Sequence, residues 1–189
     1  MIDKHEVVIR FGDQLMNLYH LGYVSEDLAK VLVLAHSARE IRLGAVENFG
    51  SAVFRDPYDV GRNDPRFQGF LELLRIEKVR SGSIEIVLAS ASLLSSIVVP
   101  LVILRAQQTA GRGELTLDVR SNHPLINPLL QRYSAGDFGR GPEAMNRLFS
   151  DLARAGVDVS PISNDVFVID SIVQRYSRRI ASVIKMKRQ

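Results

Sequence analysis

The sequence predicts an α+β fold, in which a mixed or antiparallel sheet of about five strands is covered by four or more helices, one of them very apolar. Short segments of alternating apolar and polar residues, longer segments with apolar residues at helical spacing, and turns marked by glycine or proline all support this class. A length of 189 residues with 46% hydrophobic residues suits one domain over 1–189. The expected strands lie near residues 6–11, 74–79, 84–88, 114–120 and 165–170.

Each expected strand has a local signal. The first is rich in β-branched residues and ends at a Gly-Asp turn. The second and third flank Arg80-Ser81-Gly82-Ser83, so we expect a β-hairpin with Gly82 at positive φ. The fourth, ELTLDVR, alternates apolar and polar residues, and the fifth has the sequence DVFVID. Residues 157–159 read as a further short strand.

Two amphipathic helices have clear start and stop signals. The first is expected over about 26–43, because Ser25 is a suitable N-cap and Gly44 a suitable C′ residue. The second starts with Pro142 at its first position and is closed by Gly156. Apolar residues recur at i, i+3, i+4 and i+7 in both, which indicates one buried face.

The stretch 86–104 holds nineteen residues without a charge, twelve of them Ile, Leu or Val. It predicts an apolar helix over about 89–107, and two environments remain open for it. The helix is either buried in the core or in a homo-oligomer interface, or it belongs to a single membrane span at about 86–104. If strand pairing extends to Leu88, the uncharged helical part is only about 24 Å long, which is short for a span. The residues expected to make its contacts are Leu93, Leu94, Ile97, Val98, Leu101 and Val102.

The basic character of the chain lies at its C-terminus. The net charge is +3, yet the last nineteen residues hold six basic and no acidic side chains. We expect a basic amphipathic helix over about 171–188, whose apolar stripe docks on its own domain. The alternatives are binding to an anionic membrane or to a partner groove, while nucleic acid is disfavoured because only Tyr176 interleaves the bases. The candidate contact residues are Arg175, Arg178, Arg179, Lys185, Lys187 and Arg188.

No catalytic, cofactor-binding or metal-binding residue is assigned. The absence of cysteine excludes disulfides, thiolate metal sites and a cysteine nucleophile. His36 and Glu40 share a helical face, but no third metal ligand is visible. The Asp137-Phe138-Gly139 triplet lacks the other kinase motifs, and the surrounding glycines match no phosphate loop. An enzyme of unrecognised type would have to use the polar loops at 56–64 and 136–140.

One segment carries a resemblance. Ile76-Glu77-Lys78-Val79-Arg80-Ser81-Gly82-Ser83-Ile84-Glu85-Ile86, followed by an apolar helix, resembles a loose group of uncharacterised bacterial proteins with a Gly-Ser-(Ile/Phe)-Glu-Ile strand before a hydrophobic segment. The resemblance covers about residues 6–104. It implies a bacterial origin and membrane association, and it implies no activity.

The leading functional hypothesis is a non-catalytic interaction or assembly protein that self-associates through its apolar helix. The alternatives are a membrane-associated protein with a single span and an enzyme of unrecognised type. The N-terminal residues lack the basic and long apolar regions of a secretory signal, so a cytoplasmic location is expected, with the inner membrane as the alternative. The expected partner is a second copy or another protein, and no cofactor is expected.

Overall fold

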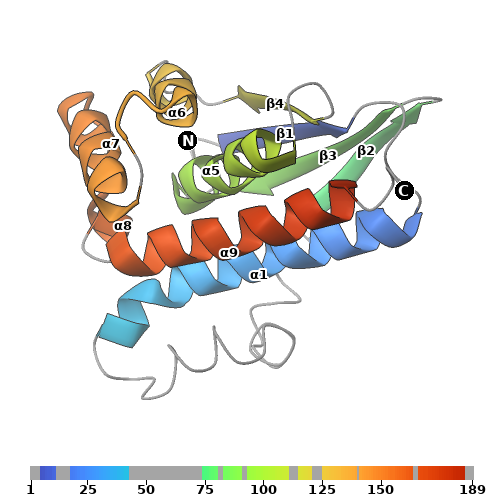
Figure 1. The fold of residues 1–189 in the computed structure, drawn as a ribbon, viewed down its shortest axis with the longest axis horizontal. Coiled ribbons are helices and arrows are strands. Elements are labelled where there is room, and N and C mark those ends of the chain that lie inside the picture. The colour runs from blue at the N-terminus through green and yellow to red at the C-terminus, as the bar shows by residue number, and fades with distance from the viewer. Residues whose placement is uncertain are drawn as a thin grey trace.

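The computed structural model describes residues 5–11, 18–42, 74–80, 83–90, 93–110, 115–120, 125–139, 141–163 and 166–185. Element labels follow Figure 1. The strands are β1 (His5–Phe11), β2 (Leu74–Arg80), β3 (Ser83–Ser90) and β4 (Leu115–Arg120). The helices are α1 (Leu18–Arg42), α5 (Leu93–Ala110), α6 (Ile126–Ala135), α7 (Pro142–Arg154), α8 (Ser160–Ser163) and α9 (Val166–Lys185).

The four strands form an antiparallel sheet in the order β2-β3-β1-β4. Strand β1 is one of the two central strands, and its Ile9 lies opposite Ile86 on β3 and Leu117 on β4. Ile9 is fully buried. Three apolar positions therefore meet in one row across the sheet, and cross-strand rows of this kind stabilise a sheet.

The hairpin between β2 and β3 pairs Arg80 with Ser83, which leaves two residues for the turn. A two-residue connection is the commonest hairpin loop. Gly82, which we expected at positive φ, lies outside the described residues. The pairing also shifts between Ile76 and Lys78, as at a β-bulge.

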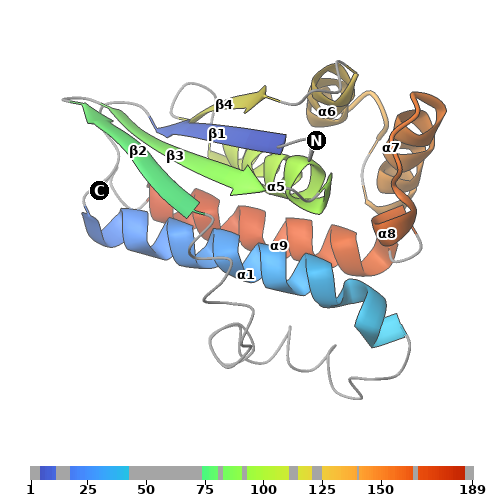
Figure 2. The ribbon, with the colours of Figure 1, turned by 180° about the vertical axis from the view of Figure 1, so that it is seen from behind.

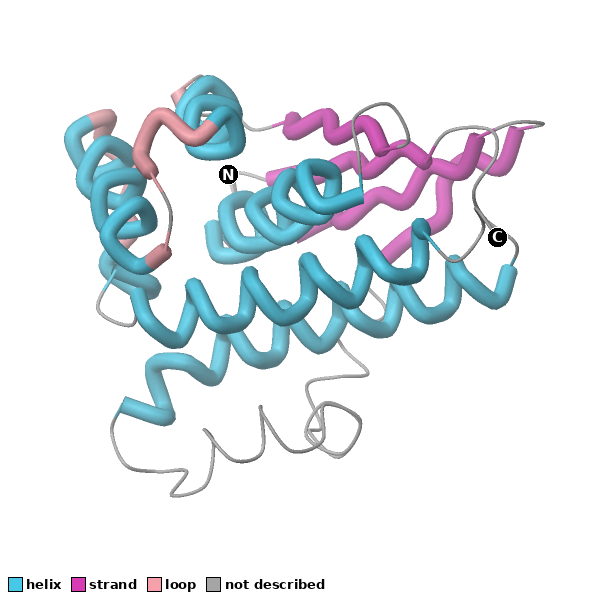
Figure 3. Tube along the Cα trace, viewed as in Figure 1, coloured by secondary structure: helices cyan, strands magenta, loops and turns pink. Residues whose placement is uncertain are grey.

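The helices are layered on the sheet around α5. Figures 1 and 2 show α5 against the sheet, with α9 and α1 side by side next to it. Figure 3 shows the same arrangement coloured by secondary structure, with α6 and α7 at one end of the molecule. Helix α5 touches β1, β3, β4, α1, α6 and α9, so it is the central element of the described fold.

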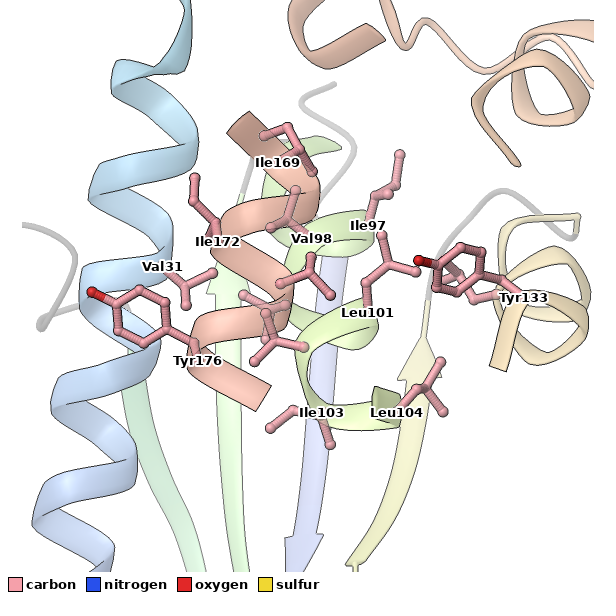
Figure 4. Packing of buried hydrophobic residues seen from close by; sticks show 14 of the residues in the cluster. Val31, Ile97, Val98, Leu101, Ile103, Leu104, Tyr133, Ile169, Ile172 and Tyr176 are labelled. Carbon is pink, nitrogen blue, oxygen red and sulfur yellow. The ribbon is translucent and has the colours of Figure 1, made fainter. Parts of the chain in front are cut away.

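The apolar side chains of α5 form the core of this arrangement. Ile97, Val98, Leu101, Val102 and Ile103 are fully buried. Figure 4 shows several of them between α9, α1, α6 and the sheet. Completely burying one such side chain contributes about 1.5 to 3 kcal/mol, so this helix supplies much of the hydrophobic stabilisation.

The uncharged stretch 86–104 is divided between two elements. Its first residues belong to β3, and the part from Leu93 onward belongs to α5. Within the ranges that the structure describes, no helix is both long enough and apolar enough to cross a membrane.

Helix α1 begins before its predicted N-cap. It starts at Leu18, so Ser25 lies inside the helix. Leu21, Val24 and Leu28 are all buried, and their spacing extends the predicted stripe backward by about two turns. The physical reason is tertiary packing of this stripe, which outweighs the capping preference of a serine.

The predicted fold class with a five-stranded sheet is wrong. Residues 165–170 were expected as a strand, but α9 begins at Val166 and continues to Lys185. The described parts of the chain are mostly helical, and among strand residues only Ile9 has a described side chain. Residues 157–159 also lie outside any strand.

The burial pattern explains why the fifth strand is a helix. In a strand, residues 167 and 169 would lie on the same face. Instead Phe167 is 75% exposed and Ile169 is fully buried. Ile169, Ile172, Val173 and Tyr176 recur at helical spacing and are all buried, so the six-residue window was too short to show the true period.

We predict that Leu101→Ala lowers the free energy of unfolding by about 2 to 5 kcal/mol, because the cavity lies in the core and its walls cannot close fully. Equilibrium unfolding in urea measures the change. Gln108→Ala, at an exposed position near the end of the same helix, should change stability by less than about 0.5 kcal/mol. Equal effects of the two substitutions would show that α5 is not the core helix.

Candidate functional site

Helix α9 has two different faces, and its inner face is docked on the rest of the chain. Ile172, Val173, Tyr176 and Ile180 are buried against neighbouring helices, mainly α5 and α1. The apolar stripe that we expected to dock on its own domain therefore does so. Its burial fixes the rotation of α9 about its axis and determines which residues remain outside.

A buried ion pair reinforces this docking. Asp27 on α1 is 2% exposed and accepts hydrogen bonds from Arg179 on α9. The Nε atom of Arg179 lies 3.1 Å from both Oδ1 and Oδ2, and Nη2 lies 2.8 Å from Oδ1. Such a two-pronged contact holds the two helices in one register as well as in contact.

The ion pair lies among further charged and aromatic groups. Lys30 is almost fully buried, and its Nζ atom lies 2.8 Å from Oε1 of Glu26, one helical turn away. Burial raises the pKa of Asp27, and the positive charges of Arg179 and Lys30 oppose that rise. Burial and the charge of Asp27 raise the pKa of Tyr176 above its ordinary value. We call the Asp27–Arg179 contact the clamp between α1 and α9.

Arg179 differs from the other described basic residues of α9 because its side chain is already paired within the chain. It was one of six basic residues that the sequence proposed for a partner or membrane, but its guanidinium group is bonded to Asp27 inside the α1–α9 contact. Two others, Lys187 and Arg188, lie outside the described residues. The structure places the remaining three, Arg175, Arg178 and Lys185, on α9 with their side chains partly or fully exposed.

These three bases lie on the outer face of α9, which also carries Phe167. Arg178 and Lys185 follow Phe167 by 11 and 18 residues, or about three and five helical turns. These two bases therefore point the same way as Phe167. The only acidic residue of α9 is Asp170, which is buried. In Figure 1, α9 lies in front of α1, and no other described element is drawn over it. We call Phe167, Arg175, Arg178 and Lys185 the outer face of α9.

The apolar candidates on α5 lie in the opposite environment. Ile97, Val98, Leu101 and Val102 are fully buried within the chain. The side chains of Leu93 and Leu94 are outside the described ones. These four apolar side chains of α5 are therefore not accessible to a partner in the described structure.

A second buried polar group lies away from the clamp. Asp170 on α9 accepts a hydrogen bond of 2.5 Å from Gln174 through Oδ2, while Oδ1 has no partner. The hydroxyl of Tyr133 on α6 is also buried without a partner. Burial raises the pKa of this hydroxyl, and the positive charge of Arg105 opposes the rise. The two oxygen atoms show no geometry that identifies a ligand.

The glycine-rich segment after α6 has a structural role. Gly136 caps α6 in the left-handed conformation, with φ of 93° and backbone bonds to the carbonyls of Arg132 and Tyr133. Phe138 is buried, with its ring centroid 6.5 Å from that of Tyr133 and 5.0 Å from the guanidinium carbon of Arg132. The triplet that contains it is therefore part of a helix-capping turn.

Within the described residues, no group of three or more His, Asp or Glu side chains could hold a metal ion. His36 and Glu40 lie on α1, but their side chains are not among the described ones. The polar loop at 56–64, the other candidate region for an enzyme, lies outside the described residues.

Comparison of the chain with models of protein families, with curated proteins and with solved structures finds no match.

Sequence reasoning missed two residues of this region. Asp27 falls in the first turn of the helix expected over about 26–43, and no pattern in one sequence connects it with Arg179, 152 residues away. Phe167 was assigned to a strand. Extending the helical spacing of Ile172 and Tyr176 backward to Ile169 would have placed Phe167 on the exposed side.

We predict that Arg179→Ala costs about 3 to 5 kcal/mol of stability at neutral pH, because it leaves Asp27 charged and buried. The neighbouring change Arg178→Ala, at an exposed position, should cost less than about 0.5 kcal/mol. Urea unfolding of both variants measures the difference. Similar losses would show that the ion pair does not join the two helices.

We predict a distinct pH dependence for the same variant. Because the pKa of Asp27 is raised in the folded state, its contribution to stability is largest below the ordinary value of 3.8 and declines as pH rises through the folded pKa. Removal of Arg179 removes an opposing charge and raises that pKa further. The stability deficit of Arg179→Ala should therefore be smaller at about pH 4.5 than at pH 7. A deficit that grows in acid would contradict this account.

Proposed function

We propose that this protein is a non-catalytic interaction protein that binds a negatively charged partner through the outer face of α9. The observation that carries the proposal is the charge of that face, which presents Arg175, Arg178 and Lys185 and no acidic side chain. A surface of one charge attracts and orients a partner of the opposite charge.

The three bases are available for such a contact. Among the described residues, none of them forms an ion pair within the chain, unlike Arg179, Lys30, Arg132 and Arg154. Arg178 and Lys185 are exposed, and Arg175 is partly exposed. A partner would therefore meet these charges without first breaking internal bonds, and each base near an anionic surface contributes about 1 kcal/mol.

The clamp between α1 and α9 supports the same function. The apolar stripe and the Asp27–Arg179 bonds hold α9 at a fixed rotation, so its bases remain on one side. Preorganisation of this kind reduces the entropy lost on binding. By contrast, the buried side chains of α5 would need the core to open before they could meet a second copy.

We predict that the triple variant Arg175→Gln, Arg178→Gln and Lys185→Gln binds anionic vesicles and acidic polypeptides much more weakly than wild type. Two probes serve: vesicles of phosphatidylcholine with about one quarter phosphatidylglycerol, and immobilised poly-glutamate. The loss of three contacts of about 1 kcal/mol each predicts a decrease in affinity of roughly 100-fold at low salt. Binding by wild type should itself fall steeply as salt is raised.

The matched control removes the same charge elsewhere. Arg132, Arg147 and Arg154 are exposed on α6 and α7, so their replacement by Gln changes the net charge equally. This control should retain most of the binding. The proposal is overturned if wild type binds neither probe, or if the two triple variants lose affinity to the same extent.

A further inference from the structure

We infer that the negatively charged partner is a lipid bilayer, on which the outer face of α9 lies flat while Phe167 enters the acyl region. This inference rests on the proposed function and adds the class of partner. It starts from Phe167, the uncharged aromatic side chain on that face, which an anionic partner alone does not require.

Phe167 is 75% exposed, the highest exposure among the large apolar side chains described. A second exposed apolar residue, Leu125, is 47% exposed and precedes α6. An exposed phenylalanine is costly in water and becomes favourable where an apolar layer lies beneath a charged surface. A bilayer with anionic head groups has that layered structure, whereas bases alone would suffice for an acidic protein.

The shape of the outer face fits a flat surface. From Phe167 to Lys185 the helix extends about 27 Å in a straight line. The exposed or partly exposed described residues of α9 between Phe167 and Lys185 also include the neutral Ser171, Gln174 and Ser182, and none of them is acidic.

The apolar stripe of α9 is already docked within the chain, and this limits how deeply the helix can enter a bilayer. An amphipathic helix that is free in solution would bury its whole apolar face in the interface. Here that face is docked on α5 and α1, so Phe167 is the apolar group left for the lipid. We therefore expect shallow, reversible binding that needs both the bases and the ring.

The test uses the absence of tryptophan from the chain. Phe167→Trp introduces a single fluorophore at the proposed entry point, and Leu125→Trp introduces one at an exposed site off α9. With vesicles of phosphatidylcholine and phosphatidylglycerol, we expect a blue shift and quenching by brominated acyl chains for Trp at 167 alone. Vesicles of phosphatidylcholine without the anionic lipid should produce neither change.

A second variant measures how much the ring of Phe167 contributes to vesicle affinity. Phe167→Ser should reduce vesicle affinity about tenfold, since part of the ring's burial is lost, while leaving the melting temperature unchanged because the position is exposed. Poly-glutamate binding should be unaffected.

The outcomes separate the two proposals. If Trp at 167 stays in water while vesicle binding still depends on the three bases, insertion is refuted and the proposed function stands. If the protein binds poly-glutamate and not anionic vesicles, the partner is an acidic protein and this inference fails. If wild type binds neither probe, the proposed function itself is refuted.

Discussion

The fold depends on the burial of α5, because every other layer is placed by contact with it. The helix presents apolar side chains around its circumference, and a helix of that composition must be covered on all sides. The sheet covers one side, and α9, α1 and α6 cover the others. The hydrophobic effect therefore determines the position of elements that lie far apart in the sequence, while the sheet register and the ion pair refine that position.

The clamp between α1 and α9 shows how a polar contact adds specificity to this burial. Apolar stripes alone tolerate small sliding movements, whereas a guanidinium group bonded to both oxygens of a buried carboxylate has one geometry. The cost of burying Asp27 is expressed in its raised pKa. The pair thus contributes orientation more than net stability, and orientation is what a one-sided basic face requires.

Local patterns in the sequence predicted local structure better than architecture. The helix over Pro142–Arg154 was predicted from its proline at the first position and its apolar spacing, and Gly156 follows it at positive φ. The error at 165–170 arose because six residues rich in Val and Ile fit both periods, and only the packing of Ile169, Ile172 and Tyr176 decides between them. The contact of Asp27 with Arg179 joins distant segments, so no local rule could reveal it.

The candidate site could be predicted only in part, because the sequence does not show which face of a helix is packed against distant segments. A count of basic residues located the helix that carries the proposed contact face, but it could not distinguish Arg179, which is bonded to Asp27, from Arg178, which faces solvent. Neighbouring residues on a helix point about 100° apart, and the rotation of the helix is fixed by packing. Assignment of side chains to the two faces therefore had to wait for the contacts of α9.

The order of the elements also has a consequence for synthesis on the ribosome. Helix α5 ends at Ala110, whereas α9, which covers it, begins at Val166. At 5 to 20 residues per second, roughly 3 to 11 seconds separate the emergence of the two helices. During that interval the most apolar segment of the nascent chain lacks the cover that α9 provides and is a natural substrate for chaperones that bind extended apolar sequences.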